Sequence, residues 1–153
     1  MKIQRETTFI SSFFFQPVYT LQGSLLAVEL LVRFNSEDHK LSTPTELVMK
    51  SLDRPQIVAL LMEQVAWAER HADWFHRAGV PLNLNIGEAC ARAIVQEPVL
   101  RRHLTALPFV HLEIAESYPA LSSGKRNPVL AALSRDFTLW LDSFGSGNAT
   151  LTP

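Results

Sequence analysis

The chain has 153 residues, of which 47% are hydrophobic, and its formal net charge is −1 at pH 7. This length and composition suit a single domain with one hydrophobic core. The near-neutral charge and the lack of a Lys/Arg run argue against direct binding to nucleic acid, which needs a concentrated basic patch. No apolar stretch reaches the roughly 18 residues that cross a bilayer, and residues 1–6 lead into no apolar leader segment. We therefore expect a cytoplasmic protein that does not bind a membrane.

Strand-like and helix-like segments alternate along the chain. The strands are predicted at residues 13–19, 24–34, 81–86, 109–115 and 138–142, with a turn at Gly23 that makes the first two a hairpin. The helices are predicted at residues 44–52, 55–79, 88–106 with an interruption near Pro98, and 128–135 with Asn127 as the N-cap. This alternation is typical of an α/β fold with a parallel sheet.

Acidic and amide side chains recur at or just past the ends of these strands. They are Glu29, Asn85, Glu113, Glu116 and Asp142. A barrel of parallel strands places its chemistry at strand ends, so we expect these residues to meet at one site. Their oxygens are the hard ligands that Mg²⁺ or Mn²⁺ prefers. Three alternatives remain: Asn85 caps the next helix, Glu113 faces solvent on an edge strand, and Asp142 caps a Gly-rich turn.

Five short motifs resemble those of the EAL family of cyclic-di-GMP phosphodiesterases, in the family's order and spacing. They are Phe15-Gln16-Pro17-Val18-Tyr19, Val28-Glu29-Leu30 followed by Arg33, Leu84-Asn85-Ile86, Glu113-Ile114-Ala115-Glu116-Ser117 and Leu141-Asp142-Ser143-Phe144-Gly145-Ser146-Gly147. The resemblance implies an EAL-type (β/α) TIM barrel with metal ligands at Glu29, Asn85, Glu113 and Asp142. It also implies contacts to cyclic-di-GMP from Gln16 and Arg33, while Glu116 and Ser143 occupy further motif positions.

The predicted barrel is incomplete. A (β/α)₈ barrel needs about 250 residues, and we predict about five of its eight strands within residues 1–153, taken as one partial EAL-like domain. Family members continue with strands that carry a lysine, a glutamate and a glutamine. We expect either a truncated product or fragment, or self-association through an open edge near residues 139–141. Trp67 lies off the apolar stripe of its helix and is expected either at an interface or beneath a neighbouring helix.

Two departures from the family pattern bear on catalysis. The family's last motif has two consecutive aspartates, and the second is Ser143 here, whose neutral hydroxyl poorly replaces a metal-bound carboxylate. The first signature reads Val28-Glu29-Leu30 in place of Glu-Ala-Leu. We therefore expect no intact catalytic set and at most one weak Mg²⁺ or Mn²⁺ site.

Residues 44–48 and 116–125 resemble degenerate, YdiV-like members of the family, which regulate motility by binding the flagellar regulator subunit FlhD. This resemblance implies a non-catalytic regulator whose partner is an FlhD-type transcription factor subunit. Two alternatives stay open. One is the N-terminal part of a metal-dependent phosphodiesterase that hydrolyses cyclic-di-GMP to linear pGpG, and the other is a sensor that binds cyclic-di-GMP without cutting it.

Overall fold

The computed structural model describes residues 1–3, 9–38, 42–115, 118, 127–142 and 148–151. The strands are β1 Lys2–Ile3, β2 Phe9–Tyr19, β3 Leu25–Ser36, β4 Ser42–Thr43, β5 Leu82–Ile86, β6 Val110–Ala115, β7 Leu139–Asp142 and β8 Asn148–Leu151. The helices are α1 Thr45–Ser51, α2 Arg54–Arg70, α3 Ala72–Ala78, α4 Glu88–Gln96, α5 Pro98–Thr105 and α6 Pro128–Asp136. The five predicted strands are confirmed as β2, β3, β5, β6 and β7.

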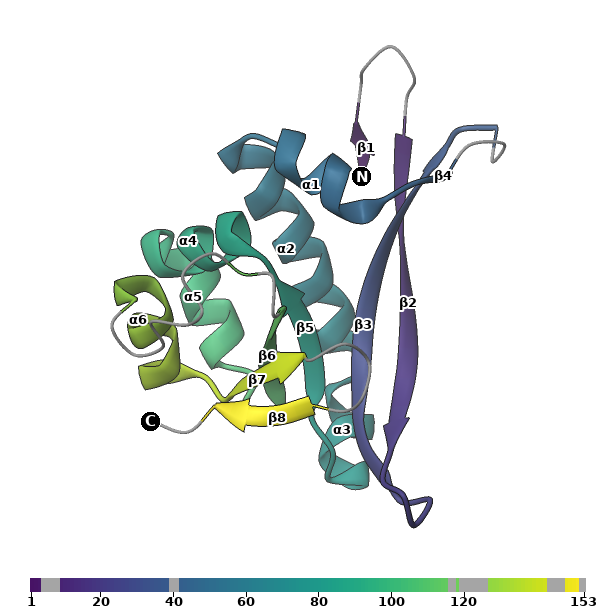
Figure 1. Ribbon diagram of the computed structural model, residues 1–153, viewed down its shortest axis with the longest axis vertical. Helices are drawn as coiled ribbons and strands as arrows, with labels where there is room; N and C mark the ends of the chain where they lie inside the picture. Colours follow the sequence, from purple (N-terminus) through teal and green to yellow (C-terminus); the bar gives the residue numbers. More distant parts are fainter. Residues whose placement is uncertain (4–8, 39–41, 116–117, 119–126, 143–147, 152–153) are drawn as a thin grey trace.

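One sheet contains all the described strands. Its order is β1-β2-β3-β5-β6-β7-β8, with β4 paired to β3 as a short branch (Figure 1). The strands β3, β5, β6 and β7 pair in parallel, whereas β2 pairs antiparallel with β3, as the hairpin prediction requires. The strand order has two ends, so the described part of the chain forms an α/β fold with an open sheet.

The expected open edge at residues 139–141 is wrong. The outer side of β7 is paired antiparallel with β8, with Leu139 opposite Leu151 and Asp142 opposite Asn148. A return strand satisfies the backbone groups that an edge strand would leave exposed. The ends of the sheet are therefore β8 on one side and β2, with the short β1, on the other.

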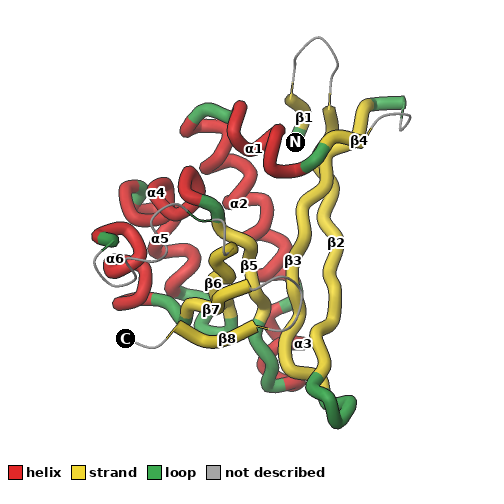
Figure 2. Tube along the Cα trace, viewed as in Figure 1, coloured by secondary structure: helices red, strands yellow, loops and turns green. Residues whose placement is uncertain are grey.

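The core lies between one face of the sheet and a layer of helices (Figure 2). Alternate residues of the parallel strands point to this face, as the period of a strand requires. Leu30, Leu84 and Leu112 are register partners across β3, β5 and β6, and each is at most 1% exposed. They pack in one cluster with Ile57 and Val65 of α2.

The helix predicted at residues 55–79 is two helices, α2 and α3, that meet at His71. The N–H of His71 donates to Ala68 O instead of Trp67 O, and His71 Nδ1 lies 2.8 Å from Trp67 O. The imidazole thus takes the carbonyl that the next α-helical turn would use, which interrupts the helix. The α2 helix begins at a capping box of Asp53 and Gln56.

Trp67 is half-buried and packs against the core. Its ring stacks on His71 at 4.2 Å between centroids and lies 6.1 Å from Phe15 of β2 and 6.3 Å from Phe75 of α3. The packing alternative for Trp67 is therefore supported, because the indole lies between α2, α3 and β2. The interface alternative stays a prediction.

Two helix boundaries follow from single residues, as predicted. The Asn127 side chain accepts hydrogen bonds from the N–H groups of Val129 at 3.0 Å and Leu130 at 3.1 Å, which caps α6. Pro98 begins α5 directly after α4 ends, because proline is compatible with the first turn of a helix but not with its interior.

Cys90 gives a prediction about chemical reactivity. Its side chain is 2% exposed on α4, and burial raises the pKa of the thiol from 9.0 to about 11. Since only the thiolate is nucleophilic, we expect iodoacetamide to label the folded chain at least about 100-fold more slowly than the urea-unfolded chain at about pH 8. Mass spectrometry of timed samples measures both rates. Equal rates would contradict the buried position of Cys90.

Candidate functional site

Strand register brings the predicted site residues onto the sheet face that is opposite to the helices. Gln16 of β2 is paired with Glu29 of β3, and Glu29 is paired with Asn83 of β5. Two residues further along β5, Asn85 is paired with Glu113 of β6. Paired residues share a face, and so do residues two apart in one strand. Gln16, Glu29, Asn85 and Glu113 therefore share one face, which we call the polar face.

The polar face continues across β7. Trp140 is the register partner of Glu113, and Asp142 is the partner of Ala115, so the backbone places Asp142 on the same face. The Asp142 side chain, Glu116 and Ser143 lie outside the described residues, as does the turn that Asp142 was expected to cap as an alternative. The side chains of the site are thus described on β2, β3, β5 and β6.

Two alternatives for these residues are wrong. Asn85 does not cap α4, whose N-cap is Gly87 with no side-chain hydrogen bond. Glu113 does not face solvent on an edge strand, because β6 lies between β5 and β7 and the side chain is 1% exposed. Asn85 Nδ2 instead donates to Leu30 O over 3.3 Å. Because a carbonyl oxygen can only accept, the Asn85 atom in this bond is the amide nitrogen. The Asn85 Oδ1 oxygen is therefore the atom that can bind a ligand.

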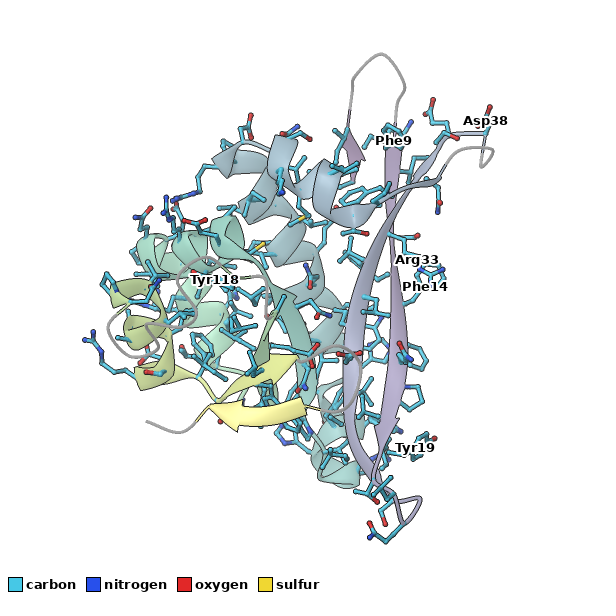
Figure 3. All side chains as sticks on the ribbon, in the orientation of Figure 1. Phe9, Phe14, Tyr19, Arg33, Asp38 and Tyr118 are labelled. Atoms are coloured by element: carbon cyan, nitrogen blue, oxygen red, sulfur yellow. The ribbon has the colours of Figure 1, made fainter. Side chains whose placement is uncertain are left out.

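Gln16 and Arg33 lie on the polar face at different distances from Glu29. Gln16 is directly opposite Glu29, whereas Arg33 lies four residues along β3, about 13 Å away at 3.3 Å per residue. The guanidinium carbon of Arg33 lies 4.9 Å from the ring centroid of Phe14, a cation–π contact at the outer rim (Figure 3). Arg33 is exposed in this position, so its hydrogen-bond donors face solvent.

The sequence analysis missed two residues of the polar face, Asn83 and His111. They are register partners on β5 and β6, and each lies two residues before a predicted ligand, Asn85 or Glu113. Asn83 is 0% exposed, and neither its Oδ1 nor its Nδ2 has a hydrogen-bond partner among the described residues. Leaving such a buried amide unsatisfied costs about 1–3 kcal/mol. The signal available in the sequence was the two-residue spacing from each predicted ligand.

His111 is held as a neutral imidazole. Burial lowers the pKa of its half-buried ring below the ordinary value of 6.5. Trp140 Nε1 donates a hydrogen bond to His111 Nδ1 over 2.9 Å. An indole nitrogen only donates, so Nδ1 must be the acceptor and the ring hydrogen must be on Nε2. His111 therefore presents an N–H donor to its surroundings, not a lone pair for a metal.

The polar face has the donor chemistry for one hard divalent cation. Glu29 and Glu113 supply carboxylates and Asn85 supplies an amide oxygen, which are the ligand types that Mg²⁺ and Mn²⁺ prefer. Within the described ranges, no three His, Cys, Asp or Glu side chains lie close enough together to hold a metal ion. Among the described side chains, a cation site here therefore consists of Glu29, Glu113 and the amide of Asn85. The sequence analysis adds Asp142, whose side chain is not described.

Comparison with known proteins identifies the family. Residues 7–152 match the family model of the EAL domain. The chain belongs to the EAL domain family. The resemblance predicted from the five motifs is thus confirmed, and the open α/β sheet is the EAL-like fold of this chain.

Two relatives and one solved structure that are similar to the chain are all named YdiV. The anti-FlhC(2)FlhD(4) factor YdiV of Salmonella typhimurium strain LT2 is 33% identical over 140 residues, which are 92% of this chain and 59% of the relative. The putative anti-FlhC(2)FlhD(4) factor YdiV of Escherichia coli K12 is 32% identical over 151 residues, 99% of this chain and 64% of the relative. The crystal structure of the EAL-like domain protein YdiV superposes with a TM-score of 0.82 at 32% identity, covering 93% of this chain and 60% of that one. The chain thus spans about three-fifths of the length of these relatives.

Proposed function

We propose that this EAL-family chain is a non-catalytic regulator that acts by binding an FlhD-type subunit of a transcription regulator. The observation that carries the proposal is the similarity to YdiV, at 33% identity over 92% of the chain, because those relatives are named as factors against FlhC(2)FlhD(4). A protein with this partner works in the cytoplasm, and no helix in the described ranges is long and apolar enough to span a membrane.

The proposed lack of catalysis is supported by the last motif. Hydrolysis of a phosphodiester by two metal ions needs carboxylates for both ions, so that one activates water while the other stabilises the leaving oxygen. Ser143 stands where the family has its second consecutive aspartate. The polar face offers oxygen ligands for one ion, which we propose binds weakly as Mg²⁺ or Mn²⁺ at Glu29, Asn85, Glu113 and Asp142.

Cyclic-di-GMP is the competing ligand, as the substrate of a partial phosphodiesterase or as the signal of a sensor. Its support is that Gln16 and Arg33 lie on the same face as Glu29 and that Arg33 is exposed. A guanidinium fork is suited to a phosphate. We place this ligand second because Arg33, the arginine proposed to bind phosphate, lies about 13 Å from Glu29 at 3.3 Å per residue along the strand.

We further propose that the chain self-associates through the outer edge of β2. Beyond Ser11, no described strand pairs with this edge. Residues 9–28 contain no Asp, Glu, Lys or Arg. Exposed apolar side chains of β2 and its hairpin, which lie on both faces of the sheet, are Phe14, Phe15, Tyr19, Leu21 and Leu26. An uncharged open edge fits the same edge of a second copy, because no like charges oppose each other.

Two assays on the purified chain test the proposed function. A binding titration with an FlhD-type subunit is expected to saturate. Incubation with cyclic-di-GMP and Mn²⁺, followed by chromatography, is expected to give no linear product, and Ser143→Asp alone is not expected to create one. Product that scales with protein and disappears in Glu29→Ala would favour the phosphodiesterase instead.

A further inference from the structure

Asn83 is a buried amide whose hydrogen-bonding groups have no partner in the described chain. It is 0% exposed as the second residue of β5, between Glu29 on one neighbouring strand and His111 on the other. Buried side-chain amides are nearly always hydrogen-bonded, so an exception inside a candidate site indicates a group that a ligand satisfies. The motifs that assign Glu29, Asn85 and Glu113 to the site do not include Asn83.

His111 offers a fixed donor beside this amide. Its Nδ1 accepts from Trp140 Nε1 over 2.9 Å, so its hydrogen is on Nε2. That tautomer cannot ligate a metal ion directly, because the ligating nitrogen must have a free lone pair. Together, Asn83 and His111 present two kinds of N–H donor and one acceptor oxygen, Asn83 Oδ1.

We propose that Asn83 and His111 form a binding position for a water molecule held by a divalent cation at Glu29, Asn85 and Glu113. Water both donates and accepts, so it satisfies Asn83 Oδ1 and either N–H donor. The adjacent Glu29 carboxylate disfavours an anion. Asn83 lies two residues deeper than Asn85 along β5, about 7 Å, where a water molecule fits more readily than a larger ligand.

This inference rests on the cation site proposed above and not on the FlhD-type partner. Groups that orient the ligands of a metal, or the water it holds, change metal affinity by about 10–100-fold when they are replaced. In the metal-free chain, by contrast, an apolar side chain at position 83 removes an unsatisfied amide. The two effects have opposite signs, which a purely structural asparagine would not produce.

The test compares Asn83→Leu with the wild-type chain by Mn²⁺ calorimetry and by thermal melting without metal. We expect Mn²⁺ affinity to fall at least about tenfold while the metal-free melting temperature rises. Asn83→Ala, which cannot overpack the site, is expected to show the same loss of affinity. His111→Phe should also weaken Mn²⁺ binding.

Asn127→Ala is the matched control, because it removes an asparagine side chain that caps α6 away from the polar face. It should lower the melting temperature and leave Mn²⁺ affinity unchanged. Unchanged Mn²⁺ affinity in both Asn83 variants would overturn the inference while leaving the cation site intact. A wild-type chain that binds no Mn²⁺ would overturn both, and neither result affects the proposed partner.

Discussion

Phe15→Lys is expected to weaken the proposed self-association of the chain. Phe15 is 65% exposed on β2, whose outer edge has no described strand partner beyond Ser11. A lysine on an open edge places two like charges close together when two copies of that edge pair, and natural sheets use this device to block association. We expect the association constant to fall at least tenfold, equivalent to about 1.4 kcal/mol.

Sedimentation velocity across a micromolar concentration series measures this effect. Val99→Lys is the matched control, because Val99 is a similarly exposed apolar residue, 56%, on α5. That variant should associate as the wild-type chain does. A wild-type chain that sediments as a monomer throughout, or equal loss of association in both variants, would refute pairing through β2.

Leu84→Ala is expected to lower the free energy of unfolding by about 3 kcal/mol. Leu84 is 0% exposed and lies between Leu30 and Leu112 in the register of the three central parallel strands. Removing its side-chain carbons leaves a cavity between the sheet and the helices that the neighbouring strands cannot close. The polar face depends on these same strands, so the variant should also weaken any ligand bound there.

Urea denaturation measures the change in the free energy of unfolding. An unchanged slope of this free energy against urea concentration indicates that the transition stays two-state. Leu47→Ala makes the same substitution at a residue that is 61% exposed on α1, and it should change stability by no more than about 0.5 kcal/mol. Equal losses in the two variants would contradict the position of Leu84 at the centre of the core.

The sequence predicts those parts of the fold that local signals control. Pro98 and Asn127 mark helix boundaries because a proline or a cap acts on its own turn, whatever the rest of the chain does. The position of Glu29, Asn85 and Glu113 on one face of the sheet agrees with the expectation drawn from strand ends, because their strands are parallel neighbours. The family itself was also recognisable from those motifs.

Other features depend on contacts between segments that are distant in sequence. The imidazole of His71 breaks a helix whose apolar stripe runs on unchanged to Phe75. The strand β8 pairs with the outer edge of β7, which the sequence analysis expected to be unpaired. The unsatisfied amide of Asn83 can be recognised only in the structure, where β3 and β6 flank it. In the sequence alone, Asn83 is simply a polar residue of a strand.

The central claim is that this chain regulates by binding a protein, and calorimetric titration with a purified FlhD-type subunit tests it most directly. The Phe15→Lys variant is the suitable form of the chain if self-association competes with the titration. We predict saturable binding that persists when Glu29 is replaced by alanine, because we do not expect the proposed cation site on the polar face to contact the partner. No saturable binding, together with turnover of cyclic-di-GMP by the same preparation, would contradict the account.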